Sequence, residues 1–399
     1  MSEEFYRIKR LPPYVIAEVN GMRAAARAAG RDIIDLGMGN PDLPPPQHVI
    51  DKLCEVAMKP DAHGYSASKG IPGLRKAQAQ YYGRRFGVDV DPETEVVMTM
   101  GSKEGLASLA TAITAPGDVV LAPNPSYPIH TFGFIIAGAT IRSVPTTPDE
   151  DYFRALERAM AFTVPRPSIL IVNYPSNPTA ETVDLAFYER LVAWAKDNKV
   201  WVISDLAYSE LYYDGNPTVS ILQVPGAKDV AIEFTSLSKT FSMAGWRVGF
   251  AVGNQRLIAA LTRVKSYLDY GAFTPIQAAA CAALNGPQDI VEANRTLYQK
   301  RRDVLVESFG RAGWHIPSPR ASMFAWAPLP PALKDMGSLE FSKQLLTHAE
   351  VAVAPGVGYG EEGEGYVRIA LVENEQRLRQ AARNVRRYLQ SMGINSSAA

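Results

Sequence analysis

Short apolar runs recur along the first two thirds of the chain, and segments with a helical pattern lie between some of them. The runs are Val96–Met100, Val119–Ala122, Ile169–Val172, Val200–Ile203 and Val230–Phe234. They are rich in β-branched residues and apolar at both odd and even positions, which is typical of strands covered on both faces. One intervening segment, Glu181–Asn198, has a helical pattern. This alternation predicts an α/β fold built on a mostly parallel central sheet.

The last third of the chain has a different pattern, which predicts a smaller α+β domain. Its predicted helices and strands are Leu297–Ala312, Ser322–Ala327, Ser338–Ala349, Tyr366–Leu371 and Asn374–Met392. A further helix is expected near Val15–Ala29. We place the large domain at residues 47–286. The small domain is expected at 287–399, joined by an N-terminal arm and helix at 1–46.

The composition excludes several classes of protein. Lys and Arg number 41, as do Asp and Glu, so a chain with no net charge has no reason to bind nucleic acid or an acidic membrane surface. No apolar run reaches the length of about 18 residues that spans a membrane. The N-terminal MSEEFYRIKR lacks the apolar stretch of a secretory signal. Cys54 and Cys281 match no metal spacing, so we expect two buried free thiols in a reducing cytoplasm and no metal site.

Polar residues follow each of the five apolar runs. They are Gly101-Ser102-Lys103, then Tyr127, then Asn177, then Asp205 with Tyr208, and finally Ser236, Ser238 and Lys239. The carboxyl ends of parallel strands lie at one edge of a sheet, and open α/β folds bind their ligands at that edge. Five separate strand ends of this kind therefore predict one composite site.

Part of this set suits a phosphate group. The segment Gly101–Lys103 opens a helical pattern, and the free N–H groups and positive dipole of a helix N-terminus attract phosphate. Arg247 follows Lys239 by eight residues and could bind the same group, together with the hydroxyls of Ser236 and Ser238.

The other residues suit a flat ring that carries a carbonyl and a basic nitrogen. Asp205 ends an apolar strand, where a carboxylate is costly unless it meets a cation. Lys239 is a candidate nucleophile if burial or a nearby cation lowers its pKa. Tyr127 offers a face for stacking, and Asn177 and Tyr208 offer hydrogen bonds. Pyridoxal 5′-phosphate (PLP) would use all of these groups.

The same residues resemble those of the class I and II aminotransferases of PLP fold type I. The motif Ser236-x-Ser238-Lys239 with Arg247, the pairs Asn177-Pro178 and Asp205-x-x-Tyr208, and Arg368 match this family in order and spacing. Longer blocks such as RLPPYV, HGYSASKGIPGLR, GSKEGLA, PNPSYPIH and KSYLDYGAFTP are most similar to the bacterial glutamate–pyruvate (alanine) aminotransferases. The LL-diaminopimelate aminotransferases share several of them.

The resemblance implies a role for each matched residue. Lys239 would bind PLP covalently and later move a proton between the substrate and the cofactor, while Asp205 would keep the ring nitrogen protonated. Ring contacts would come from Tyr127, Asn177 and Tyr208, and phosphate contacts from Gly101, Ser102, Lys103, Ser236, Ser238 and Arg247. Arg368 would bind the substrate α-carboxylate with a bidentate fork, beside Gly39 and Asn177. Tyr65 would reach the phosphate of a neighbouring subunit, which implies a homodimer.

The activity that the resemblance implies is the transfer of an amino group between an L-amino acid and a 2-oxo acid in two half-reactions. L-alanine and 2-oxoglutarate, giving pyruvate and L-glutamate, are the favoured pair. A second arginine is expected for the side chain of glutamate, and the sequence does not identify one. LL-diaminopimelate, aspartate and methionine therefore stay open as amino donors.

Two other classes of function can be compared with the same motifs. A PLP-dependent lyase would keep the same lysine, aspartate and arginines but would need no oxo-acid acceptor. A PLP-sensing transcription factor needs a DNA-binding domain, and only about 35 residues precede DLGMGNPD. The Lys103 side chain is expected to face solvent, with recognition of a distal carboxylate as the alternative. His130 and His63 are interpreted as structural.

Overall fold

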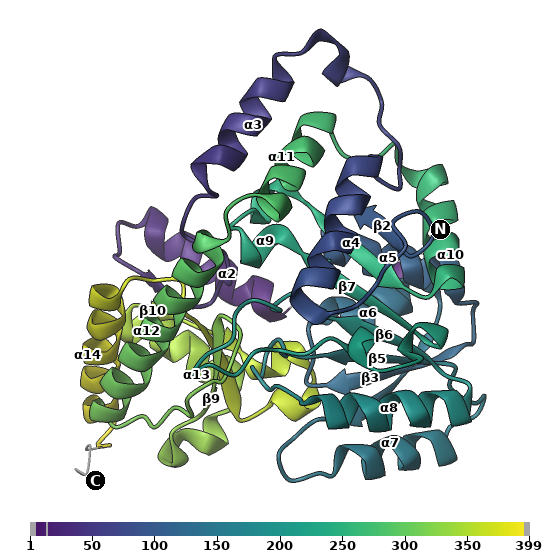
Figure 1. Ribbon diagram of the computed structural model, residues 1–399. Coiled ribbons are helices and arrows are strands. Elements are labelled where there is room, and N and C mark those ends of the chain that lie inside the picture. Colours follow the sequence, from purple (N-terminus) through teal and green to yellow (C-terminus); the bar gives the residue numbers. More distant parts are fainter. Residues whose placement is uncertain (1–4, 13–14, 395–399) are drawn as a thin grey trace.

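A seven-stranded sheet forms the centre of the larger part of the molecule (Figure 1). The computed structural model describes residues 5–12 and 15–394, so the first four residues of MSEEFYRIKR lie outside it. The strand order is β2-β8-β7-β6-β5-β3-β4. The strands are β2 Val96–Thr99, β3 Val119–Asn124, β4 Thr140–Pro145, β5 Ile169–Asn173, β6 Trp201–Asp205, β7 Ala231–Ser236 and β8 Gly249–Gly253. All five strands that the sequence predicts are confirmed, and β4 and β8 are two that it misses.

The direction of the strands brings the predicted polar ends together. Strands β4, β3, β5, β6 and β7 are parallel, and β8 is antiparallel to both β7 and β2. Two antiparallel pairings in succession restore the direction, so β2 runs the same way as β7. The carboxyl ends of all five predicted strands therefore lie at one edge of the sheet, as the sequence predicts.

Helices cover both faces of this sheet. Alternate residues of β5 show how: Ile169 and Ile171 pack in one apolar core, while Leu170 and Val172 pack in another. The first core contains residues of α5, α6 and α10, and the second contains residues of α3, α4, α7, α8 and α11. Burial on both faces explains why β2, β3, β5 and β6 are apolar until their last residues, while β7 carries one buried acidic residue, Glu233, in its middle.

The helices of this part begin at residues suited to a helix N-terminus. Proline occupies the first turn of α4, α6 and α11, and Asp151, Asp184 and Asn254 cap α7, α8 and α10 with their side chains. The helices are α3 Gln47–Ala57, α4 Pro72–Phe86, α5 Ser102–Ile113, α6 Pro128–Ala137, α7 Tyr152–Ala161, α8 Leu185–Asn198, α9 Leu237–Thr240, α10 Gln255–Leu268 and α11 Thr274–Asn285. Helix α3 projects from the body and packs against α11 (Figure 1).

The smaller part contains the elements predicted for the last third of the chain. A three-stranded antiparallel sheet has the order β11-β12-β9. Strand β1, near the N-terminus, pairs in parallel with β10 and joins the N-terminal segment to this part. The elements are α1 Tyr6–Lys9, α2 Val15–Ala28, β1 Ile34–Asp35, α12 Asp289–Arg311, β9 Phe324–Pro328, α13 Ser338–Gln344, β10 Val351–Ala352, β11 Ala354–Pro355, β12 Tyr366–Ala370 and α14 Glu375–Ser391.

The predicted division at residues 46/47 and 286/287 stays a prediction. The core of the smaller part also contains Tyr208, Leu211 and Tyr213, which lie in the predicted large domain. The two parts therefore share an apolar core as well as a chain connection. Within residues 5–12 and 15–394, no helix combines the length and the apolar character needed to cross a bilayer.

A buried carboxyl group lies between the large sheet and the helices on one face. Glu233 of β7 is fully buried and accepts hydrogen bonds from Tyr82, Ser204 and Ser220. Burial raises the pKa of its carboxyl from an ordinary 4.5 to about 7, although these hydrogen bonds oppose the shift. A free carboxyl in the unfolded chain loses its proton near pH 4.5. Between about pH 4.5 and pH 7, the folded chain therefore keeps this proton, whereas the unfolded chain has lost it.

We predict that Glu233 makes the protein less stable as the pH rises from about 4.5 to 7, and Glu233→Gln should abolish that loss. The free energy of unfolding would fall by about 3 kcal/mol, because the pKa rises from 4.5 to about 7 and one pKa unit corresponds to about 1.4 kcal/mol. Urea unfolding at pH 5 and pH 8 measures it. The exposed Glu189→Gln is the control and should keep the pH slope of the wild type. An equal slope in wild type and Glu233→Gln would contradict the prediction.

Candidate active site

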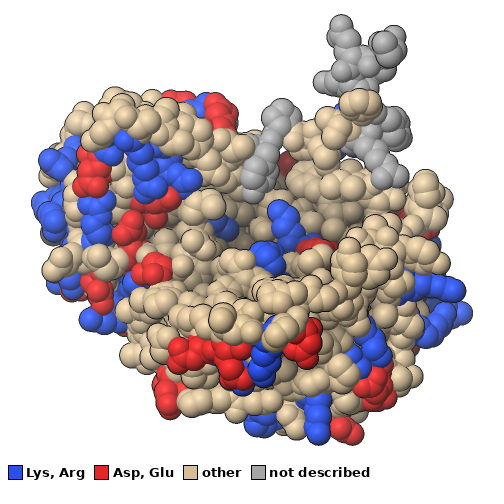
Figure 2. Space-filling view, turned by 90° about the horizontal axis from the view of Figure 1, so that it is seen from above, with Lys and Arg blue, Asp and Glu red and all other residues tan. Residues whose placement is uncertain are grey.

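A cavity of about 840 Å³ opens at the carboxyl edge of the sheet, where the larger and smaller parts meet. Figure 2 shows basic side chains inside a hollow on this face of the molecule. All of the predicted site residues line the cavity except Gly101 and Tyr65. Those that line it are Gly39, Ser102, Lys103, Tyr127, Asn177, Asp205, Tyr208, Ser236, Ser238, Lys239, Arg247 and Arg368.

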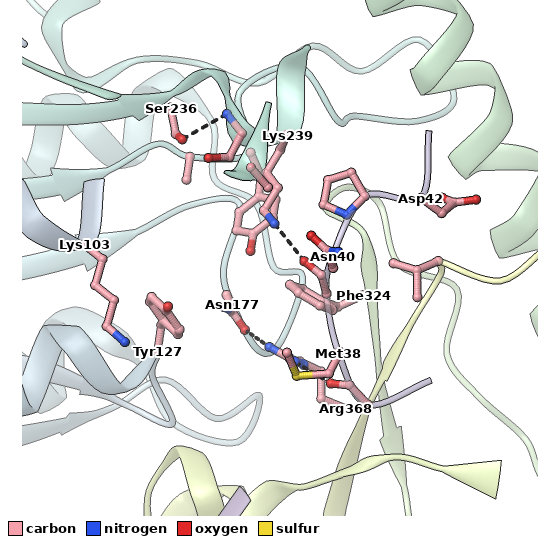
Figure 3. Close-up of a pocket in the computed structure, with 18 of the residues that line it drawn as sticks. Met38, Asn40, Asp42, Lys103, Tyr127, Asn177, Ser236, Lys239, Phe324 and Arg368 are labelled. Carbon is pink, nitrogen blue, oxygen red and sulfur yellow. Dashed lines mark hydrogen bonds between the residues drawn. The ribbon is translucent and has the colours of Figure 1, made fainter. Parts of the chain in front are cut away.

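Lys239 projects into the cavity from α9, a single helical turn directly after β7. Its Nζ atom donates a hydrogen bond to the carbonyl oxygen of Gly39 at 2.7 Å (Figure 3). Burial, followed by the positive charges of Arg368 and Arg247, lowers the pKa of this lysine from 10.5 to about 8. A lysine of this kind is neutral, and hence nucleophilic, in a larger fraction of molecules than an exposed one.

The predicted phosphate end of the cavity forms where β2, β7 and β8 meet α5. Helix α5 begins at Ser102, and the preceding Gly101 has a φ of +81°, a conformation that favours glycine. A Cβ atom at Gly101 would clash with the guanidinium of Arg247, so the absence of a side chain at Gly101 leaves room for that guanidinium. Arg247 donates hydrogen bonds to the carbonyl oxygens of Ala244 and Met100. Ser236 and Ser238 line the same end.

Asp205 has a partner that the sequence analysis did not assign. Nε2 of His130 lies 2.8 Å from Oδ2 of Asp205, and the imidazole is fully buried. A carboxylate can only accept, so Nε2 carries the proton of this bond. The second oxygen of Asp205 accepts from the backbone N–H of Ala207. Interpreting His130 as merely structural was therefore incomplete, because it orients Asp205 at the site.

Arg368 of β12 crosses from the smaller part to the larger one. Its guanidinium donates to Oδ1 of Asn177 at 2.8 Å and to the carbonyl oxygen of Gly37 at 2.9 Å (Figure 3). It also lies over the ring of Phe324, 3.9 Å from the ring centroid. The sequence analysis missed Phe324 and Gly37. Phe324 lies in a predicted strand next to β12, and the pairing of the two strands is what brings it beneath the arginine.

Tyr127 and Lys103 lie together on the opposite side of the cavity (Figure 3). The Nζ atom of Lys103 is 6.0 Å from the centroid of the Tyr127 ring. The ring of Tyr127 packs edge-on against His130, and Tyr208 packs edge-on against Phe324. The Lys103 side chain is exposed, as predicted, yet it also lines the cavity.

Tyr65 lies outside the cavity. Its side chain is 89% exposed and packs against Tyr270, with 4.6 Å between the ring centroids. Tyr267, Leu268 and Phe273 are further exposed apolar residues of the same region of the sequence as Tyr270. The role implied for Tyr65 stays a prediction, because it needs a second subunit.

The charges of the cavity fit a ligand with two anionic groups. In the described part of the chain, Lys239, Arg247 and Arg368 form no ion pair with an acidic side chain, and the carboxylate of Asp205 is bound to His130. Arg247 lies beside the N-terminus of α5, and Arg368 lies at the far end near Asn177. The residues present therefore fit PLP, with a phosphate at one end and the carboxylate of an amino acid at the other.

Comparisons with known proteins show the family to which this chain belongs. A model of the family "Aminotransferase class I and II" matches residues 31–385. Aminotransferase AatC of Rhizobium meliloti (strain 1021), so named without a stated substrate, is 64% identical over 389 residues, 98% of this chain and 96% of that protein. The glutamate-pyruvate aminotransferase AlaC of Escherichia coli (strain K12) is 53% identical over 393 residues, 98% of this chain and 95% of that protein.

A more distant relative and a solved structure extend the likeness. An LL-diaminopimelate aminotransferase of Moorella thermoacetica (strain ATCC 39073 / JCM 9320) is 43% identical over 387 residues, 97% of this chain and 98% of that protein. A structure of substrate-bound BacF from Bacillus subtilis matches with a TM-score of 0.91 and 34% identity, covering 97% of this chain and 98% of that one.

We predict that Lys239 titrates near pH 8 in cofactor-free protein, and that Arg368→Gln raises the midpoint because it removes a nearby positive charge. Acylation by acetic anhydride at a series of pH values, followed by mass spectrometry of the Lys239 peptide, gives the midpoint. Arg320→Gln, an exposed arginine outside the cavity, is the matched control and should leave it unchanged. A midpoint near the ordinary lysine value in the wild type would contradict the prediction.

Proposed function

Because the chain belongs to the class I and II aminotransferases, PLP-dependent enzymes of fold type I, we propose that it transfers the amino group of L-alanine to 2-oxoglutarate. The products would be pyruvate and L-glutamate. One observation supports the chemistry above all: a partly buried lysine of lowered pKa shares one cavity with two arginines that form no ion pair with any described acidic side chain. The choice of substrates rests on the 53% identity with AlaC.

The phosphate and ring of PLP would be held by groups that the fold already positions. The N–H groups at the start of α5, with Ser236, Ser238 and Arg247, would bind the phosphate. Tyr127 would stack on the ring, and Asn177 and Tyr208 would donate to its hydroxyl oxygen. When bound, PLP supplies a ring that withdraws electrons from the substrate Cα.

Lys239 would carry out the proton transfers of the reaction, and Asp205 would bind the ring nitrogen. The Nζ atom of Lys239, neutral in part near pH 8, would form the covalent bond to the cofactor and afterwards remove and return the proton of the substrate Cα. Asp205, fixed by His130, would pair its carboxylate with the ring nitrogen. The fixed orientation of Asp205 avoids reorganisation during the reaction.

Arg368 would orient both substrates through a group that they have in common. Every amino acid and 2-oxo acid carries an α-carboxylate, and the planar guanidinium can donate two parallel hydrogen bonds to it. Phe324 and Asn177 hold this guanidinium in place before the substrate arrives. A single arginine can therefore serve both half-reactions, because the amino acid leaves as an oxo acid before the second substrate binds.

The side-chain contact of glutamate remains the open part of this proposal. The expected second arginine has one further candidate in the cavity, Arg27, whose Nη2 atom lies 3.8 Å from the carboxylate of Asp35. This neighbour partly neutralises its charge. The likeness to an LL-diaminopimelate aminotransferase, at 43% identity, favours that substrate as the second candidate.

Single half-reactions test the substrate assignment. The purified PLP form is mixed with alanine, glutamate, aspartate, methionine, valine or LL-diaminopimelate, one at a time, and its conversion to the pyridoxamine form is followed by absorbance. Rapid conversion with alanine and glutamate alone is expected. Rapid conversion with LL-diaminopimelate and little with alanine would overturn the substrate assignment but not the assignment of the catalytic residues.

Lys239→Ala should abolish conversion with every donor, and conversion that persists would refute the role of Lys239.

A homodimer with the cytoplasm as its compartment belongs to the same proposal. The exposed residues Tyr65, Tyr267, Leu268, Tyr270 and Phe273 support a second copy as the occupant of this surface. The two free cysteines support a reducing compartment, although the prediction that both are buried was wrong, because Cys54 is exposed and Cys281 is only partly buried. We predict twice the mass of one chain in sedimentation. Tyr65→Phe should keep that mass and weaken PLP retention, because Tyr65 would reach the partner's phosphate. A monomer in sedimentation would contradict the proposal.

A further inference from the structure

Lys265, on α10, is a fully buried lysine outside the cavity. Its Nζ atom lies 2.8 Å from the carboxylate of Asp269 and 3.3 Å from both carboxylate oxygens of Glu104. Its side chain is 1% exposed, so no water screens these contacts. One ammonium therefore holds two carboxylates from different elements, and neither the sequence motifs nor the proposed mechanism accounts for it.

The first carboxylate leads to the phosphate end of the cavity. Oε2 of Glu104 accepts a hydrogen bond from the backbone N–H of Met100 at 2.8 Å, and Oε1 accepts one from Ser108. Met100 directly precedes Gly101, and its carbonyl oxygen accepts from Arg247. We call the segment Met100–Lys103 together with Arg247 the cradle. Glu104 thus fixes the residue at which the chain enters the cradle.

The second carboxylate leads to the loops at the exposed aromatic residues. Oδ1 of Asp269 accepts from the backbone N–H of Gly271, and its backbone carbonyl accepts from Ser68. Gln277 ties the same two loops again by donating to Ser66 and to the carbonyl oxygen of Ala272. Tyr65 and Tyr270, which pack on each other, therefore lie on loops that Asp269 holds together.

We propose that Lys265 is a positioning residue for the cofactor phosphate: it holds Glu104 so that the cradle keeps the geometry that binds phosphate. This inference rests on the proposed role of the cradle in holding PLP. Without the ammonium, Glu104 and Asp269 are two carboxylates with no cation between them, and they repel each other. Glu104 would then turn away from Met100, and the backbone of Met100, where the chain enters the cradle, would no longer be held by this hydrogen bond.

A comparison of PLP with pyridoxal, which lacks the phosphate, separates positioning from general stability. The full-length protein is freed of PLP, and the binding of each compound to wild type and Lys265→Met is measured by equilibrium dialysis. We expect PLP affinity to fall about 10-fold or more, because charged hydrogen bonds to the phosphate would be weakened, while pyridoxal affinity changes little. Lys228→Met removes another lysine paired to a glutamate, Glu95, and should change neither affinity.

A rescue variant tests the electrostatic cause. Gln at position 104 still accepts from the N–H of Met100 but carries no charge, so Lys265→Met with Glu104→Gln should recover much of the lost preference for PLP over pyridoxal. If Lys265→Met does not fold, Glu104→Ala provides the second test: it removes the acceptor of the Met100 N–H and should lower PLP affinity but not pyridoxal affinity.

The outcomes distinguish this inference from the proposed function. An equal weakening of PLP and pyridoxal in Lys265→Met would overturn the inference, because it is the result of a merely structural lysine. Arg247→Met is the reference for the cradle itself and should lower PLP affinity but not pyridoxal affinity. If Arg247→Met leaves the preference unchanged, the phosphate assignment fails. If it lowers the preference and Lys265→Met does not, only the role of Lys265 fails.

Discussion

The site depends on positive charge that the protein does not neutralise with its own carboxylates. Lys239, Arg247 and Arg368 meet in one cavity, and among the described residues each bonds to neutral oxygen atoms instead. Such an arrangement is costly in a free protein because the cations repel one another. It becomes favourable when anions enter, because a phosphate and a carboxylate neutralise these charges. Burial, and then the same positive charges, lower the pKa of Lys239, so the cations that would bind the ligand also add to the reactivity of the lysine.

The backbone supplies the partners that keep these cations in place. Gly37 and Gly39 lie on the short segment after β1, and their carbonyl oxygens accept from Arg368 and Lys239. This segment reaches the cavity because β1 pairs with β10 of the smaller part. A Cβ at Gly39 would clash with the ring of Phe324, so only glycine lets the chain approach this closely. The N-terminal segment, far from Lys239 in sequence, thus becomes a wall of the site.

The sequence predicted the parts of the fold and site that follow from local pattern. Strands buried on both faces have a recognisable composition, and the polar residues after them mark the carboxyl edge. Strand β4 was missed because several of its residues are exposed and polar, and β8 because glycines bound its short apolar run. The contacts of His130 with Asp205 and of Phe324 with Arg368 depend on how distant elements pack. No spacing along the chain encodes them.

Three acidic groups of the large sheet and its helices follow the opposite rule from the cavity's cations: each is bonded inside the protein. Asp205 has His130, Glu104 has Lys265, and Glu233 has three hydroxyl donors and a raised pKa that favours its neutral form. An unpaired carboxylate near the cavity would compete with the phosphate and substrate for the arginines. Asp35 and Asp42, which line the cavity, are likewise paired, with Arg23 and Arg301. These pairs leave Arg247 and Arg368 to an anionic cofactor and anionic substrates, which are the ligands that fit.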